Sequence, residues 1–140
     1  MMQDFSKRFA IVVRHDLEPW QMTNVIAHIA AKLGRTVEQF DTGDFFTTKD
    51  GASIPRNSQY PIIVLRATSS DELRPLLVNV QAAQLPYLAF VREMLDLSDD
   101  AELQMALSKK AESEVEYLGI GMFGENSQVK QLTKGFDLWK

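Results

Sequence analysis

Short apolar runs separated by amphipathic segments are the feature that most restricts the fold of this chain. Residues 8–13 (RFAIVV) and 60–67 (YPIIVLRA) are two such runs, and residues 86–93 and 115–123 are two more. A strand buried on both faces appears as a continuous apolar run rather than as an alternation. Because helical patterns follow these runs, the sequence predicts an α/β fold with four strands and helices on both faces of the sheet. The 140 residues have the length of a single domain, residues 1–140.

The first helical segment has three distinct faces. Pro19 suits its first turn, and Gly34 suits the left-handed position just past its end. The apolar face predicts burial, and the face of small residues would let another backbone approach closely. The three faces consist of Met22, Val25, Ile26, Ile29 and Leu33 (apolar), of Thr23, Ala27, Ala30 and Ala31 (small), and of Gln21, Asn24, His28 and Lys32 (polar).

The remaining segments carry turn and cap signals. Asp50 and Gly51 predict a tight turn, so residues 41–60 are expected to form a small hairpin or flap. Ser69 or Ser70 is expected to cap the helix after the second strand, and Ser98 the helix before the fourth strand. Residues 125–134 predict a short last helix.

Charge and composition exclude several classes of function. The net charge of −4 argues against a general nucleic-acid binder, because phosphate binding relies on clustered Lys and Arg. The absence of cysteine excludes disulfides, thiolate catalysis and cysteine metal sites. The stretch MMQDFSKRF lacks the apolar core of a signal peptide, and no window reaches the roughly 18 apolar residues of a membrane helix. We therefore expect a soluble, cytoplasmic protein without membrane contact.

Polar residues at the ends of the predicted strands are the candidates for chemistry. In a sheet covered on both faces, functional groups lie in the loops that lead from strands to helices. The catalytic candidates are His15, Asp16, Asn24, His28 and Glu93, and the ligand-binding candidates are Arg14, Asn24, His28 and Arg92. The alternative is structural, with Arg14 or Arg92 pairing with Asp16 or Glu93 at the rim of the fold.

The sequence does not satisfy three common functional motifs, those of dinucleotide binding, metal binding and serine hydrolysis. The stretch GIGMFG (residues 119–124) has the spacing of a dinucleotide fingerprint, but it follows the last strand, and Glu125 places negative charge where a pyrophosphate would lie. Glycines that permit close helix–sheet packing are the favoured interpretation. His15, Asp16 and His28 have metal-ligand chemistry without a recognisable spacing, and no G-x-S-x-G motif occurs. We therefore expect no metal and no cofactor.

The stretches FAIVVRHDL and MTNVIAHIAA resemble the opening of type II peptidyl-tRNA hydrolases, and IIVLRATSSDELRPLLVNVQAAQLPYLAFVRE and YLGIGMFGENSQVKQLTKGFDL resemble later parts of that family. The resemblance implies a three-layer α/β/α domain with a four-stranded mixed sheet, often dimeric. The sequence is more similar to the uncharacterised relatives of those hydrolases, grouped as domain-of-unknown-function family two thousand.

The chain departs from the hydrolase pattern at the residues that carry activity. The hydrolases have a G-K-G-K stretch where this sequence has WQMTN, so that Asn24 stands nearest to the family's catalytic lysine. The family's histidine falls at about Ala31, and Glu93 replaces an aspartate. Loss of one cation that stabilises developing negative charge typically reduces the rate by about 10²–10³. Asn24 can donate a hydrogen bond but supplies no charge.

Two functions stay open, and the sequence does not decide whether the protein is an enzyme. The first is a small-ligand-binding or interaction domain that uses the groove beside the first helix, with Asn24, His28 and the flap at residues 41–60. The alternative is a hydrolase with an altered site that acts on peptidyl-tRNA or a related ester, with His28 or His15 as the base. A patch of Arg14, Arg66 and Arg92 beside the groove would favour tRNA, and a small pocket would favour a small molecule. The small-residue face of the first helix, together with the frequent dimerisation of the family that the sequence resembles, predicts a homodimer.

Overall fold

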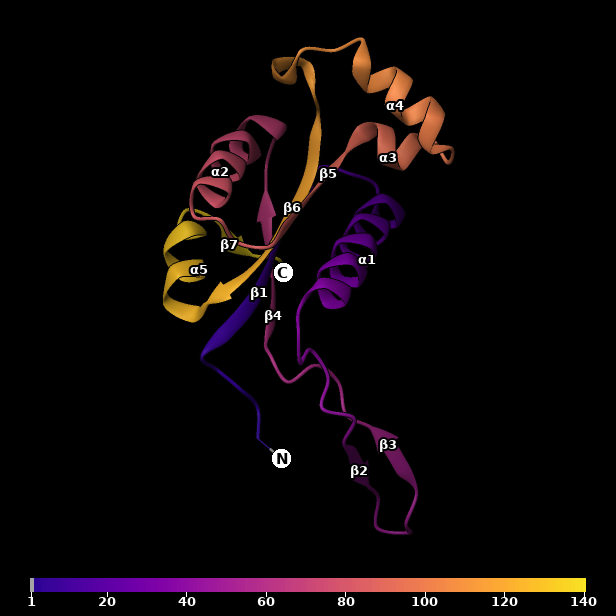
Figure 1. Ribbon diagram of the computed structural model, residues 1–140, viewed down its shortest axis with the longest axis vertical. Coiled ribbons are helices and arrows are strands. Elements are labelled where there is room, and N and C mark those ends of the chain that lie inside the picture. Colours follow the sequence, from indigo (N-terminus) through magenta and orange to yellow (C-terminus); the bar gives the residue numbers. More distant parts are fainter. Residues whose placement is uncertain (1) are drawn as a thin grey trace.

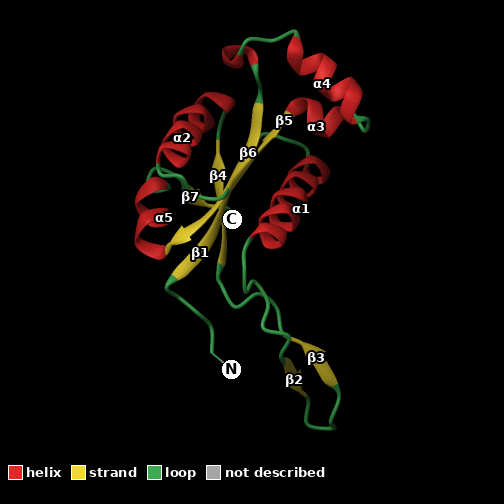
Figure 2. Ribbon diagram, viewed as in Figure 1, coloured by secondary structure: helices red, strands yellow, loops and turns green. Residues whose placement is uncertain are grey.

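Strand β1 (Lys7–Arg14) lies at the centre of the sheet and determines how the other strands are arranged. The computed structural model describes residues 2–140. β1 pairs in parallel with β4 (Ile62–Ala67) and antiparallel with β6 (Tyr117–Glu125). β5 (Tyr87–Val91) adds antiparallel to β6, and β7 (Asp137–Leu138) adds antiparallel to β4. The sheet is therefore mixed, with the strand order β5-β6-β1-β4-β7 (Figure 2).

Helices cover both faces of this sheet. α1 lies on one face, α2 and α5 lie on the other, and α3 and α4 lie beyond the end of β5 (Figure 1). The helices are α1 (Pro19–Thr36), α2 (Ser70–Ala82), α3 (Arg92–Asp96), α4 (Asp100–Ser108) and α5 (Asn126–Leu132), with a 3-10 turn at Glu112–Glu114. The predicted mixed α/β arrangement is confirmed.

The prediction of four strands was wrong, because the sheet has five. The additional strand is β7, in which Leu138 pairs with Leu65 and Asp137 pairs with Arg66. A strand of two residues is too short to show the apolar pattern by which a buried strand is recognised, and both of its residues are exposed. Its position at the edge depends on a tertiary contact with β4 rather than on local sequence.

Two apolar cores form because successive side chains of a strand point to opposite faces of the sheet. Phe9, Ile11 and Val13 of β1 pack on the α1 side, and Ala10 and Val12 pack on the side of α2 and α5. All five are at most 2% exposed. Burying an aliphatic or aromatic side chain of this size contributes about 1.5–3 kcal/mol. The central strand is thus held from both faces.

The glycines of β6 let α1 approach the sheet closely. The stretch GIGMFG lies inside β6 and does not form the turn between strand and helix that a phosphate-binding loop requires. A Cβ atom on Gly121 would overlap the side chain of Ile29 and lie 2.8 Å from Leu33 Cδ1. A Cβ atom on Gly119 would lie 2.8 Å from Val25 Cγ1. The interpretation of these glycines as packing residues is confirmed.

The ends of two helices differ from the prediction. α1 continues to Thr36, so Gly34 lies within the helix, where an added Cβ atom would contact the ring of Phe40 at 3.4 Å. The N-cap of α4 is Asp99 rather than Ser98, because the Asp99 carboxylate accepts hydrogen bonds from the first turn of the helix. Ser69 caps α2 as predicted, with its hydroxyl accepting from the Glu72 N–H.

The predicted hairpin is present but lies far from the segment of α3 and α4. β2 (Phe45–Thr47) and β3 (Ser53–Pro55) pair antiparallel, and Gly51 adopts a φ of 92° at the turn. Figure 1 shows this hairpin projecting from the end of the molecule opposite to α3 and α4. The segment therefore forms an arm, and it does not cover the sheet edge where the catalytic candidates were expected.

Most of the small-residue face of α1 is open to solvent. Thr23, Ala27 and Ala31 are exposed, whereas Ala30 is partly buried and packs against the core on the α1 side. A homodimer that uses this face stays a prediction, as does a cytoplasmic location. Within residues 2–140, α1 and the other helices lack the combination of length and apolar character needed to cross a membrane.

We predict that Gly121→Ala lowers the free energy of unfolding by about 1–3 kcal/mol, because the added methyl group forces α1 away from β6. Gly135→Ala is the matched control, since a Cβ atom there meets nothing within 4 Å and its φ is not positive. Urea unfolding followed by circular dichroism measures both variants. Equal stability of the two variants would show that the contact between α1 and β6 can relax at no cost.

Candidate functional site

Four charged side chains form a network where β1 and β5 end and β6 begins. Arg14 donates to both carboxylate oxygens of Asp16, at 3.0 and 2.8 Å, and to Glu116 at 2.7 Å. Arg92 donates to the same Glu116 at 2.9 and 3.2 Å. The three strand ends meet because β6 runs antiparallel to both β1 and β5. We refer to Arg14, Asp16, Arg92 and Glu116 as the rim network.

The rim network holds its carboxylates in the charged form. The hydrogen bond from Arg92, followed by that from Arg14, lowers the pKa of Glu116 from its ordinary value of 4.5 to about 2. The hydrogen bond from Arg14 lowers the pKa of Asp16, and the same contact raises the pKa of Arg14. Both arginines are therefore neutralised by carboxylates. The structural interpretation from the sequence is correct for Arg14, which pairs with Asp16. It is wrong for Arg92, which pairs with Glu116 and not with Glu93.

The arginines do not form a patch that is free for a nucleic acid. Arg66 lies away from the rim network and pairs with Asp137 on β7, at 3.7 Å. Arg14 and Arg92 share Glu116. The three arginines whose clustering would have favoured tRNA are thus distributed over two places, and each has an acidic partner.

Glu93 is buried and has a structural partner. It belongs to α3, is 6% exposed, and its Oε1 accepts a hydrogen bond from the ammonium of Lys110. Its Oε2 is buried and has no hydrogen-bond partner among the described residues. The pair ties the chain after α4 to the end of β5. Glu93 lines neither the cavity that His28 lines nor the depression that His15 lines.

His15 is oriented by the backbone of the neighbouring strand. Its Nδ1 lies 2.7 Å from the carbonyl oxygen of Ala67, and a carbonyl can only accept, so Nδ1 carries the hydrogen. Nε2 is left free beside a small depression of about 230 Å³ that Thr68 and Glu72 also line. The pKa of Glu72 is lowered, chiefly by the hydrogen bond from the Thr68 N–H.

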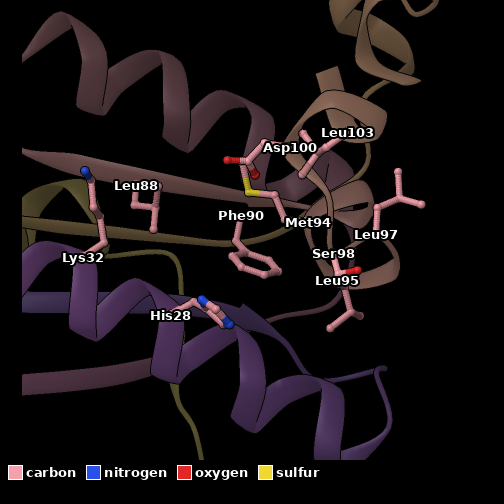
Figure 3. Close-up of a pocket in the computed structure, with 10 residues that line it drawn as sticks. All are labelled: His28, Lys32, Leu88, Phe90, Met94, Leu95, Leu97, Ser98, Asp100 and Leu103. Carbon is pink, nitrogen blue, oxygen red and sulfur yellow. The ribbon is translucent and has the colours of Figure 1, made fainter. Parts of the chain in front are cut away.

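A larger cavity of about 650 Å³ lies between α1, β5 and the segment from α3 to α4 (Figure 3). We call it the α1–β5 cavity. Its wall is mainly apolar, with four polar side chains. The lining residues are Leu88, Phe90, Met94, Leu95, Leu97 and Leu103, together with His28, Lys32, Ser98 and Asp100. A cavity therefore lies beside the first helix, but of the expected groove residues only His28 lines it, and Asn24 and the hairpin arm do not.

His28 and Lys32 reach this cavity from adjacent turns of α1. The ring of His28 lies against that of Phe90, with 5.5 Å between centroids and 39° between planes. Asn24 lies one turn earlier on the exposed polar face and does not line the cavity. His15 lines the other depression, so the two histidines do not form one site. Among residues 2–140, no three His, Asp or Glu side chains are placed to hold a metal ion.

The wall opposite α1 comes from α3 and α4 rather than from the hairpin arm. β5 leads directly into α3, where the Arg92 N–H donates to the Glu116 carbonyl at 3.0 Å. Asp99 then starts α4 by accepting from the Ala101 N–H at 2.7 Å. None of the α4 residues is buried, so this wall rests on few apolar contacts. Such elements are the ones that open at low free-energy cost.

Sequence reasoning missed four groups of residues at these sites. Lys32 was assigned only to the polar face of α1, although its spacing from His28 places both on one side of the helix. Leu88 and Phe90 alternate along β5, which brings both to the α1 face. Glu116 lies at the start of an antiparallel strand, so it meets the ends of the other strands. No local sequence pattern indicated that α3 and α4 would form the wall of the cavity opposite α1.

Comparison with known proteins shows the family but no activity. The model of the family described as "Protein of unknown function (DUF2000)" matches residues 7–140, so the chain belongs to that family. The solved structure of a protein of unknown function from Agrobacterium tumefaciens strain C58 is similar, with a TM-score of 0.83 and 21% sequence identity over 98% of this chain and 100% of that chain. At this identity the likeness shows the fold alone. No curated protein matches the chain. The relationship to type II peptidyl-tRNA hydrolases stays a prediction.

We predict that Glu116→Gln removes part of the acid dependence of stability. The folded-state pKa of about 2 lies below the ordinary value of 4.5, so Glu116 stabilises the fold fully above pH 4.5 and loses this effect as the pH falls toward 2. The difference in unfolding free energy between wild type and Glu116→Gln should shrink over that interval. Urea unfolding at several pH values measures it, with exposed Glu38→Gln as the control. A difference that does not change with pH would contradict the pKa shift.

We also predict that Lys110→Ala destabilises the protein, because it leaves the buried Glu93 carboxylate without its only hydrogen-bond donor among the described residues. Lys109→Ala is the neighbouring control, since Lys109 is exposed and its ammonium has no ion pair in residues 2–140. Addition of Glu93→Gln to Lys110→Ala should restore part of the loss. Chemical unfolding at pH 7 measures the stability of each variant. Equal stability of Lys110→Ala and Lys109→Ala would contradict the role of the Lys110–Glu93 pair.

Proposed function

We propose that this member of the DUF2000 family binds a small molecule with an apolar body in the α1–β5 cavity. The observation that carries the proposal is the cavity itself, about 650 Å³ with a mainly apolar wall and a few polar side chains. Binding sites for small molecules are typically clefts of roughly 300–1,000 Å³ with this composition. The wall is formed by α1, β5 and the segment from α3 to α4, which come from different parts of the sequence. The site is therefore built by the fold rather than by a single loop.

The lining residues give a physical reason for a ligand to bind. Leu88, Leu95 and Leu103 are only half-buried although they are apolar. A ligand that covers them removes apolar surface from water, which contributes roughly 25 cal/mol per Å². His28 supplies a polar ring that packs at a tilt against Phe90 and lines the cavity. Arg14 and Arg92 have the supporting role of fixing the strand ends through Glu116.

We predict that Leu103→Gln weakens binding of the uncharged fluorescent dye N-phenyl-1-naphthylamine by at least about fivefold, because it places a polar side chain in the apolar wall. Met105→Gln on the same helix is the control, since Met105 is 61% exposed and does not line the cavity. Neither substitution touches a buried residue, so both variants should fold. Fluorescence titration measures the dye. Equal binding by both variants would place the dye elsewhere and reject the cavity as a binding site.

A hydrolase that acts on peptidyl-tRNA or a related ester is the second candidate, because His28 lies in the cavity wall. In this alternative His28 is the general base, and Asn24 on the same helix face is the hydrogen-bond donor. A catalytic histidine is ordinarily oriented by a third group, and no described residue donates to or accepts from the His28 ring. His15 is oriented, but it lines the other depression. The geometry therefore favours binding over hydrolysis.

Release of the acyl-amino acid from an N-acylated aminoacyl-tRNA separates the two functions. We expect no turnover above buffer for the wild type, since the chain has Asn24 where the hydrolases have a lysine and since its rim arginines are neutralised. Turnover by the wild type that is lost in Asn24→Ala or His28→Ala, and kept in Arg35→Ala, would establish the hydrolase instead. Arg35 lies on the same helix and does not line the cavity.

A further inference from the structure

The polar groups of the α1–β5 cavity are distributed unequally along it. Lys32 lies at the end beside Leu88, and Leu95, Leu97 and Ser98 lie at the other end, with Phe90 between them (Figure 3). Asp100 lies on the far wall, near Met94 and Leu103, and away from Lys32. The cavity thus has one cationic end, an apolar middle and an opposite wall that carries the single carboxylate of the lining.

Lys32 differs from Arg14, Arg92 and Lys110, the cations that hold the strand ends and the chain after α4. Arg14, Arg92 and Lys110 each have a carboxylate partner. Lys32 has no ion pair among residues 2–140, and α1 contains no Asp or Glu that could supply one. Its ammonium stands next to the apolar wall at Leu88. Lys32 is exposed to solvent, so it can pair with an anion at the edge of the cavity, and solvent screens that attraction.

We infer that the ligand of this cavity is an amphipathic monocarboxylate whose carboxylate pairs with Lys32 and whose apolar body lies along Phe90 toward Leu103. The inference rests on the proposed function and specifies its ligand class. Asp100 repels a second anionic group at the far wall, so the distal end of the ligand is neutral. A phosphate would carry more charge than one ammonium can balance, and the cavity offers no arginine fork for it.

The dimensions of the elements indicate the length of the body. Lys32 and His28 are one turn apart on α1, which corresponds to about 6 Å along the helix. Leu88 and Phe90 are two residues apart on β5, which corresponds to about 7 Å. A body that runs past both levels and reaches α4 needs roughly eight to twelve carbon atoms, which is within the volume of such a pocket. Decanoate, with decan-1-ol as its uncharged counterpart, therefore fits the requirement.

The experiment measures displacement of N-phenyl-1-naphthylamine by decanoate, decan-1-ol and decyltrimethylammonium at pH 8, where the carboxylate is ionised. We expect Lys32→Gln to weaken decanoate by roughly two- to fivefold, the effect of losing one solvent-exposed ion pair, and to leave decan-1-ol unchanged. Arg35→Gln is the control on the same helix, because Arg35 does not line the cavity. Raising the salt concentration should weaken decanoate in the wild type only.

The outcomes separate the ligand class from the proposed function. If decan-1-ol and decanoate both displace the dye and Lys32→Gln changes neither, the cavity binds apolar ligands but the carboxylate inference is wrong. Preference for decyltrimethylammonium would overturn the inference as well, because it would make Asp100 the contact for the head group. If the dye does not distinguish Leu103→Gln from Met105→Gln, the proposed function fails, and the ligand class fails with it.

Discussion

The close contact between α1 and β6 is the constraint on which the rest of the structure depends. Gly119 and Gly121 leave room for Val25, Ile29 and Leu33 at the surface of the sheet, where side chains on β6 would hold the helix away. The apolar face of α1 then packs against the sheet. This orientation turns His28 and Lys32 toward β5 at the edge, and it leaves most of the small-residue face open. One packing requirement therefore positions one whole wall of the cavity.

The charged groups of the fold divide into two classes. Arg14, Asp16, Arg92 and Glu116 neutralise one another where three strands end, and Lys110 neutralises the buried Glu93. These pairs fix the chain around the cavity, because they join β1, β5, β6 and the segment after α4. Lys32 and Asp100 are the charged side chains of the cavity lining, and neither has an ion pair among residues 2–140. The first class thus holds the fold together, whereas the second class lines the cavity.

Similarity in fold does not carry over the chemistry of the site. The chain belongs to a family of unknown function and shares its fold with a bacterial protein at 21% identity, and neither fact assigns an activity. The relationship to peptidyl-tRNA hydrolases stays a prediction from the sequence, and that prediction itself has Asn24 where a catalytic lysine would be expected. Function has to be argued from the cavity and its side chains.

The sequence by itself determined the strands β1, β4, β5 and β6, the hairpin arm and the buried stripe of α1, because apolar periodicity and turn residues are local properties. It also indicated that the glycines of residues 119–124 serve packing. Only the tertiary structure decided that β7 joins the sheet, that Arg92 pairs with Glu116, and that α3 and α4 face His28 and Lys32 across a cavity. These features depend on which distant segments meet, and a two-residue strand or an unburied helix such as α4 carries no local pattern that records its partner.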